Sequence, residues 1–312
     1  MHIVPPWMDG VAFTLSEGRA IGLTDSRMRH SRFARPHRGV RLLGSSGRID
    51  DGGPIDRSAD LRLLLPPTAL FSHATAARLY GFPLPAHLAD ELHVLVPGEV
   101  PVRRPGVIGW TRVDGWPPSR LMHGMPVTAP ADTWAMLATM TDRRGGTLSR
   151  EWLVAVGDFL VSGRRTKRGR EPALATPAEL ADALVRHGSR RGAVALAWAL
   201  ARVRSPVDSP PETFLRLGLV AARLPEPVVQ PAISTSAGLR HPDLGYLAER
   251  TLIEYLGDVH RTDRDTWRKD LTRVQLFEDA GYRVILAGAD DIVPGAMRDF
   301  AERVRRALRR RG

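Results

Sequence analysis

Residues 239–258 read LRHPDLGYLAERTLIEYLGD, and this stretch decides how the C-terminal third of the chain is expected to fold. Its two halves, LRHPDLGYLAE and RTLIEYLGD, predict a hairpin-like pair of strands. The flanking segments predict, in order, a helix, a short strand, a long polar helix, a buried strand and a final helix: 209–224, 227–233, 263–280, 282–288 and the C-terminal residues. This order predicts an α/β fold, with a mixed sheet that carries helices on its faces in three layers.

The spacing of acidic residues in this segment points to a metal site. Asp243 lies on or near the first strand of the pair, and Glu254 lies within the largely apolar run TLIEYL. A carboxylate in a buried strand is costly unless it is paired or bound to a cation. Two such groups across a turn can converge on one Mg²⁺, which Glu212 on the preceding helix could reach through water. The alternatives are a turn residue for Asp243 and a solvent-facing edge acid for Glu254.

The N-terminal residues have the pattern of a winged helix-turn-helix. Thr14 can cap a first helix with Glu17 in a capping box, Gly22 ends that helix, and Thr24 or Asp25 caps a short second one. FARPHRGVRLL (33–43) then predicts a turn and a strand, as in a wing. Five arginines are the candidate DNA contacts: Arg27, Arg29, Arg32, Arg35 and Arg38. The alternative is a solvated surface that is rich in arginine because of GC-rich codon usage.

The middle of the chain predicts an α+β region and a linker. The sequence predicts a polar loop, a buried helix, two strands and a strand-turn-helix: 45–60, 72–80, 91–97, 106–112 and 124–140. His73 within that buried helix is interpreted as structural. Residues 163–178 are basic and rich in Pro and Gly and predict an exposed loop or linker, with helices at 177–187 and 191–204 after it. The predicted domains are 1–45, 60–162, 163–204 and 205–312.

Composition narrows the classes of function. The chain has 45 Lys and Arg against 34 Asp and Glu, a net charge of +11, which makes nucleic acid a natural partner. It has no cysteine, so disulfides and thiolate chemistry are excluded. No apolar run is long enough for a membrane span, and the first residues do not form a secretory signal, so we expect a cytoplasmic protein without membrane contact. Phosphate-binding glycine motifs are absent, so no nucleotide cofactor is expected.

Two known families resemble parts of this sequence. E212…HPD243…IE254YLGDVH260, followed by WRKDLTRVQLFEDAGYRVILAGADDI, resembles the PD-(D/E)XK nuclease superfamily over about 205–295. It is closest to the branch related to very-short-patch-repair (Vsr) endonucleases and to DUF559 proteins, which implies a restriction-endonuclease-like sheet. FTLSEGRAIGLT, FARPHRGV, FSHATAARLYGFPLP and GMPVTAPADTW resemble AbiEi-type antitoxins and regulators.

The nuclease resemblance implies roles for particular residues. It implies Asp243 and Glu254 as metal ligands, Glu212 as an auxiliary acid and His260 as a group that activates water or contacts phosphate. Asp270 and Arg273 match the polar pattern of the family's helix. The superfamily's lysine, two residues after the acid, is Leu256 here. Its role would fall to His260, Lys269, Arg264 or Arg268, with Asp258 as a substitute acid, or the site is impaired.

Together these features favour a DNA-binding protein with a Mg²⁺-dependent endonuclease domain that hydrolyses phosphodiester bonds, with Mn²⁺ as a substitute metal. A homodimer would suit double-strand cutting. The alternative is an antitoxin-like transcriptional regulator whose nuclease fold is catalytically impaired, and Leu256 favours it. An RNA-binding or RNA-cleaving protein is a weaker alternative, because the domain lacks aromatic stacking platforms.

Overall fold

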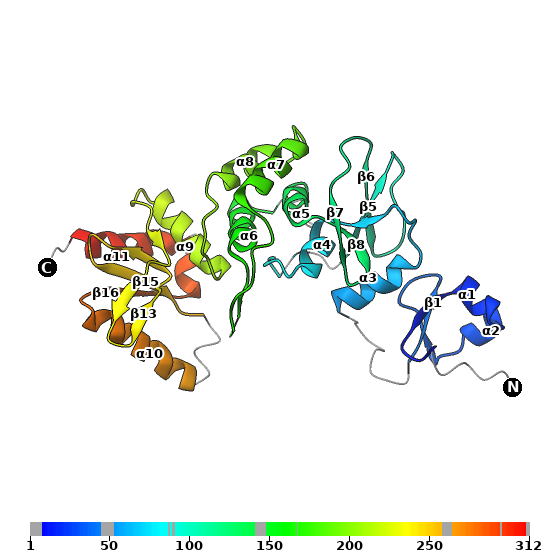
Figure 1. Ribbon diagram of the computed structural model, residues 1–312, viewed down its shortest axis with the longest axis horizontal. Coiled ribbons are helices and arrows are strands. Elements are labelled where there is room, and N and C mark those ends of the chain that lie inside the picture. The colour runs from blue at the N-terminus through cyan, green and yellow to red at the C-terminus, as the bar shows by residue number, and fades with distance from the viewer. Residues whose placement is uncertain are drawn as a thin grey trace. The chain divides into compact units, whose positions relative to one another are not determined.

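The computed structural model describes residues 8–44, 53–86, 88, 91–140, 148–166, 168–257, 264–293 and 295–309, with only the backbone of 54 and 264–270. The chain is a mixed α/β protein with several mixed sheets (Figure 1). It divides into two compact units, Met1–Gly146 and Thr147–Gly312. None of the helices in the described part of the chain has the length and apolar character to cross a bilayer.

The N-terminal unit begins with two short helices beside a three-stranded antiparallel sheet of order β1-β3-β2. Thr14 and Glu17 form the predicted capping box, and the Thr24 hydroxyl accepts a hydrogen bond from the Arg27 amide at the start of the second helix. The buried Phe13, Met28 and others fill the space between helices and sheet. The elements are β1 (Ala12–Thr14), α1 (Leu15–Ala20), α2 (Asp25–Met28), β2 (Phe33–Ala34) and β3 (Val40–Leu43).

The rest of this unit is a five-stranded mixed sheet of order β6-β5-β4-β8-β7 with three helices. Its elements are α3 (Pro54–Arg62), β4 (Leu70–Phe71), α4 (His73–Leu79), β5 (Leu92–Pro97), β6 (Val107–Arg112), β7 (Ser119–Met122), β8 (Met125–Thr128) and α5 (Pro130–Leu137). The buried helix, the two strands and the strand-turn-helix lie within one or a few residues of their predicted positions. The predicted loop at 45–60 is wrong from residue 54 onward, because Pro54 starts a helix there; residues 45–52 lie outside the described part.

The C-terminal unit starts with helices and a hairpin: α6 (Arg150–Ser162), β9 (Arg165–Thr166), β10 (Gly169–Arg170), α7 (Pro177–His187) and α8 (Ala193–Leu200). α7 has the predicted bounds because its signals are local: Thr176 and Glu179 form a capping box, and Pro177 occupies the first turn. The predicted linker at 163–178 is wrong for 165–170, where the backbone pairs as an antiparallel hairpin.

A four-stranded mixed sheet of order β11-β14-β15-β16 forms the centre of the C-terminal residues. β14 pairs antiparallel with both β11 and β15, whereas β15 and β16 are parallel. The elements are α9 (Pro210–Ala221), β11 (Val228–Val229), β12 (Ile233–Thr235), β13 (Gly238–Arg240), β14 (Leu244–Tyr246), β15 (Thr251–Tyr255), α10 (Arg264–Asp279), β16 (Arg283–Ala287), η3 (Ala289–Ile292) and α11 (Met297–Arg309).

Alternate residues of β15 divide the core between the two faces of this sheet. Ile253 packs in one cluster with Leu215 of α9 and Phe300 of α11. Leu252, on the opposite face, packs with Phe277 of α10. The sheet is therefore covered by α9 and α11 on one face and by α10 on the other (Figure 1), which is the predicted three-layer α/β arrangement.

Two strand predictions in this sheet are corrected by the structure. Residues 227–233 form two strands and not one: Gln230, with φ 44°, separates β11, which pairs with β14, from β12, which pairs with β13. β16 is not fully buried. It lies at the sheet edge, and Arg283 and Leu286 are exposed on it, because no further strand in the described part of the chain pairs with it.

Candidate active site

The first turn of α9 carries Glu212, which is 4% exposed. Its carboxylate accepts hydrogen bonds from the Ser209 hydroxyl at 2.9 Å, the Asp208 amide at 3.1 Å and the Gln230 side-chain amide at 3.3 Å. Ser209 is the N-cap residue of α9, but its hydroxyl binds Glu212 and does not cap a backbone amide. Buried and held by three donors, the Glu212 carboxylate has one fixed orientation.

Asp243 immediately precedes β14 and reaches across to the neighbouring strand. Its Oδ2 accepts a 2.7 Å hydrogen bond from the amide of Tyr255, the residue after Glu254. Its backbone carbonyl accepts a 3.0 Å hydrogen bond from the Gln230 amide. The antiparallel register brings the start of β14 beside the end of β15, so Asp243 and Glu254 lie on adjoining strand ends. Their convergence on one ion stays a prediction.

Glu254 lies on the face of β15 that carries Leu252, which is the face covered by α10. It is 7% exposed, and Arg273 of α10 is its cationic partner. Arg273 Nε lies 3.2 Å from each carboxylate oxygen, and the closest approach of its Nη2 is 3.1 Å. Arg273 Nη2 also donates to the His241 carbonyl. The structure thus gives Arg273 a specific role as the counter-ion of Glu254.

The acidic groups influence one another electrostatically. Burial raises the pKa of Asp243 above its usual range, and the Glu254 carboxylate raises it further. Burial likewise raises the pKa of Glu212, with Asp243 as the second cause. Both effects favour the neutral, protonated forms of Asp243 and Glu212. A divalent cation bound beside these carboxylates would favour their ionised forms instead.

The donor set fits Mg²⁺ in part. Carboxylate oxygens are its preferred protein ligands, and it commonly takes only one or two of them, with water and substrate phosphate as the others. Within the described residues no group of three or more His, Asp and Glu side chains is arranged to enclose an ion. Asp243 and Glu254 could therefore supply at most two protein ligands to such an ion, and water or phosphate would have to supply the others.

Several predicted site residues lie outside the described part. Asp258 and His260 are in the segment 258–263 that the structure does not describe. Lys269, Asp270, Arg264 and Arg268 fall on α10, where only the backbone is described. Leu256, at the position of the family's lysine, is half-buried, and its amide donates a 2.7 Å hydrogen bond to the Ala287 carbonyl. The roles predicted for these side chains stay predictions.

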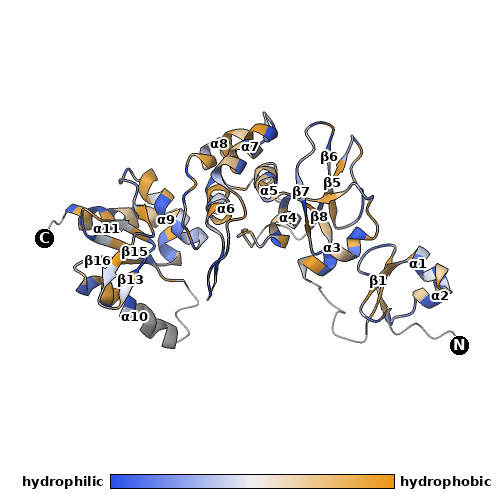
Figure 2. Cartoon of the chain, viewed as in Figure 1, coloured by the Kyte–Doolittle hydropathy of each residue, from blue (hydrophilic) through white to orange (hydrophobic). Residues whose placement is uncertain are grey.

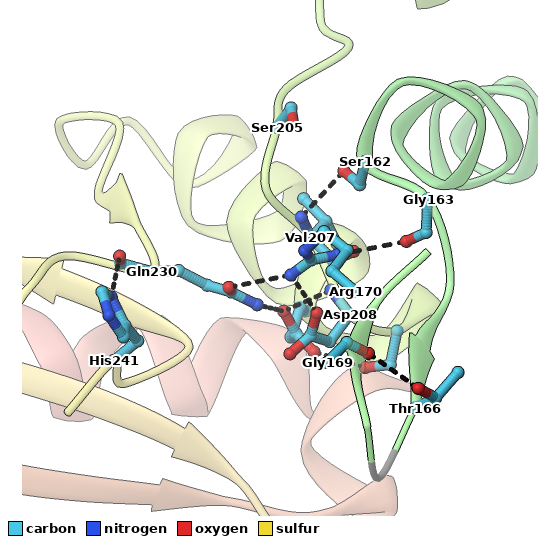
Figure 3. Close-up of polar contacts among 12 residues, drawn as sticks. Ser162, Gly163, Thr166, Gly169, Arg170, Ser205, Val207, Asp208, Gln230 and His241 are labelled. Atoms are coloured by element: carbon cyan, nitrogen blue, oxygen red, sulfur yellow. Dashed lines mark hydrogen bonds and ion pairs between the residues drawn. The ribbon is translucent and has the colours of Figure 1, made fainter. Parts of the chain in front are cut away.

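Sequence analysis missed two residues beside the acidic group, Arg170 and Gln230. Arg170 on β10 donates to Asp208 and to the Gln230 side-chain oxygen, the latter at 3.2 Å (Figure 3). Gln230 in turn donates to Glu212 at 3.3 Å. Arg170 lies 60 residues before Gln230, so no local spacing signals this contact.

Of the predicted DNA-contact arginines, Arg27 lies on α2, and the other four lie in the segments between α2, β2 and β3. Arg29, Arg32, Arg35 and Arg38 are exposed and Arg27 is half-buried. Asp25, the one acid between residues 19 and 41, forms an ion pair with Arg19 at 2.8 Å. A sixth arginine, Arg41, is buried and donates to the Met28 carbonyl at 2.7 Å, which is a structural role.

His73 is structural, in agreement with its interpretation from sequence, although it opens its helix instead of lying inside it. It is buried, its Nδ1 lies 2.9 Å from the Ser72 hydroxyl and its Nε2 3.2 Å from that of Thr139. Its ring stacks on Trp110, whose indole N–H donates to His93 at 3.0 Å. Burial lowers the pKa of His93 to about 4, so this histidine is neutral near pH 7.

Comparison with known proteins assigns this chain to no family. No family model matches the chain, and no curated protein matches it at a significant level.

Proposed function

We propose that this chain is a divalent-metal-dependent DNA endonuclease of the PD-(D/E)XK type. The observation that carries the proposal is the 2.7 Å hydrogen bond from the Tyr255 amide to Asp243, which holds that carboxylate beside Glu254 at adjoining strand ends. The four-stranded mixed sheet, with α9 and α11 on one face and α10 on the other, supports it.

Each acid has a distinct part in this proposal. Asp243 and Glu254 would hold Mg²⁺, and Mn²⁺ would substitute for it. The ion would polarise the scissile phosphate and lower the pKa of a water molecule, so that hydroxide forms and attacks the phosphorus. Glu212, held by Ser209 and Asp208, would accept a proton beside Asp243. Arg273 would neutralise Glu254 until the ion binds and would then be placed to contact phosphate.

The N-terminal arginines complete the proposal as a DNA-binding surface. Exposed guanidinium groups on a short helix-turn-helix and its sheet would contact phosphates and hold the protein on duplex DNA. We propose a cytoplasmic setting and, for double-strand cleavage, a homodimer.

The second candidate is a DNA-binding regulator whose nuclease fold no longer cuts. Two observations favour it. Leu256 supplies no charged group where the family has lysine, and the Arg273–Glu254 ion pair at 3.1 Å already neutralises one of the two metal ligands. In this case the acids would serve only to hold α9 and α10 on the sheet.

Plasmid nicking distinguishes the two candidates. The full chain is incubated with supercoiled DNA and Mg²⁺ or Mn²⁺, beside Asp243→Asn, Glu254→Gln and, as a charge-matched control on the exposed surface of α7, Asp182→Asn. A nuclease nicks DNA as the native chain and as Asp182→Asn, and loses at least about 100-fold in rate in both site variants. If neither the native chain nor the control cuts but all four proteins shift duplex DNA in EDTA, the regulator is favoured.

A further inference from the structure

The hairpin formed by β9 and β10 is a strongly basic short segment of the C-terminal unit. Residues 164–171 carry five Lys and Arg in the sequence against the single acid Glu171. Figure 2 shows this hairpin, which follows α6 and extends below it in the view, in strongly hydrophilic colours. It presents no apolar side chain, so it has nothing to bury against a protein core.

The hairpin has a defined shape although it is short. The Thr166 hydroxyl donates to the Gly169 carbonyl at 2.8 Å and accepts from the Arg168 amide at 3.2 Å, which fixes the turn. At the base, the Glu171 amide donates to the Arg164 carbonyl at 2.9 Å. Gly163 has φ +74°, and a Cβ there would lie 2.1 Å from the Glu171 carbonyl, so only glycine fits this approach.

The basic side chains of the hairpin fall into two classes. Arg164 is neutralised by Glu171, with two hydrogen bonds at 2.7 and 3.1 Å, and Arg170 by Asp208. Arg165 and Arg168 are exposed and have no carboxylate partner among the described residues. Arg165 also lies directly opposite Arg170 in the strand register, so the Asp208 carboxylate is already engaged by Arg170 on that side of the hairpin.

The base of the hairpin is tied to the acidic group. Arg170 donates to the Gly163 and Val207 carbonyls at 3.1 and 3.3 Å and to the Gln230 side chain at 3.2 Å (Figure 3). Gln230 donates onward to Glu212 at 3.3 Å. Two hydrogen bonds in series, from Arg170 to Gln230 and from Gln230 to Glu212, therefore connect the hairpin to the acidic group. Arg165 and Arg168 belong to a hairpin whose base is fixed in this way.

We propose that the β9–β10 hairpin binds the phosphate backbone of duplex DNA next to the Asp243–Glu254 site, through Arg165 and Arg168. This inference rests on the proposed function for its choice of DNA as the partner. Phosphates are the anions that two guanidinium groups, one on β9 and one in the turn after it, would recognise, and such contacts position the duplex without reading its sequence. The hairpin is thus a positioning element for cleavage and a source of affinity.

The size of the effect follows from counterion release. Each phosphate contact contributes a slope of about 0.9 to the dependence of log K on log salt, which is roughly an 8-fold gain in affinity at 0.1 M salt. Loss of two contacts should therefore weaken binding about 60-fold at 0.1 M and reduce the slope by about 1.8.

The experiment measures binding of the full chain to a fluorescent 30-base-pair duplex by anisotropy, in EDTA, across a salt series. The test variant is Arg165→Gln/Arg168→Gln. The matched control is Arg190→Gln/Arg191→Gln, two exposed arginines in the turn between α7 and α8, on the other side of α6 from the hairpin (Figure 1). Circular dichroism melting of each variant shows whether it is folded.

We expect the hairpin variant to lose affinity and slope by the amounts above, and the control to change less than 8-fold. The inference is overturned if the folded hairpin variant binds like the control, or if the native chain does not bind duplex DNA. Failure of the proposed function gives a different result: the native chain then binds DNA with the hairpin-dependent slope but does not cut it with Mg²⁺.

Discussion

The buried ion pair between Asp158 of α6 and Arg216 of α9 is the contact whose loss should most disturb the C-terminal unit. The two side chains are 0% and 1% exposed, with an N–O distance of 2.8 Å. The Asp158 carboxylate also accepts hydrogen bonds from the Thr213 hydroxyl at 2.7 Å and the Arg204 amide at 2.6 Å. It therefore joins three segments that lie up to 58 residues apart.

We expect Asp158→Asn to destabilise this unit strongly, because it leaves the buried Arg216 guanidinium with only the partly exposed Glu226 as a counter-ion. Removal of one partner of a buried pair costs about 3 to 5 kcal/mol. For a unit of this size, 1 kcal/mol lowers Tm by roughly 2 to 4 °C, so the expected fall is roughly 6 to 20 °C.

The assay is calorimetric melting at pH 8, which is above the pKa of about 6 to which burial raises Asp158. Glu171→Gln, which breaks the exposed ion pair to Arg164, is the control and should change Tm little. The double variant Asp158→Asn/Arg216→Met should be less destabilised than the sum of its two single variants. If Asp158→Asn and Glu171→Gln had the same Tm, the conclusion that the buried Asp158–Arg216 pair holds α6 against α9 would be wrong.

Two further outcomes follow from the structure. Burial holds the pKa of His93 at about 4, whereas the unfolded chain has a value near 6.5, so the folded N-terminal unit binds fewer protons between these pH values. Its free energy of unfolding should therefore fall by about 3 kcal/mol as the pH drops from 7 to 4. Urea unfolding of His93→Gln should not show this loss. Gly163→Ala should lower the free energy of unfolding by about 1 to 3 kcal/mol and make the hairpin susceptible to trypsin, because alanine rarely adopts this positive φ. Gly10→Ala is the control: φ is also positive there, but no atom lies within 4 Å of the added Cβ, so it should be better tolerated. An equal loss of stability in the two variants would contradict this explanation.

Local signals explain why much of the fold could be predicted. Thr14, Thr24 and Thr176 are caps whose hydrogen bonds involve residues only three positions away. Strand positions in the C-terminal sheet followed from short apolar runs. The division of residues 227–233 could not be predicted, because it depends on which distant strands β11 and β12 pair with. The hairpin at 165–170 is too short to show any periodicity.

In the candidate site, too, some contacts could be predicted from sequence and others depend on the tertiary fold. That Asp243 and Glu254 lie on neighbouring segments could be predicted, because a short turn joins the strand that follows Asp243 to the strand that carries Glu254. Arg273 was predicted only as an auxiliary group; its contact with Glu254 depends on how α10 packs on the sheet, 19 residues away. Arg170 and Gln230 were missed because only the tertiary fold brings β10 beside β11.

The central claim is that Asp243 and Glu254 together hold a divalent ion, and metal binding tests it without requiring the right DNA substrate. Isothermal titration of Mn²⁺ into the full chain should show one saturable site. Asp243→Asn, which keeps the oxygen that accepts from the Tyr255 amide, should lose that site while it melts like the native chain. Equal Mn²⁺ binding by the native chain and by Asp243→Asn, or no binding by either, would contradict the account.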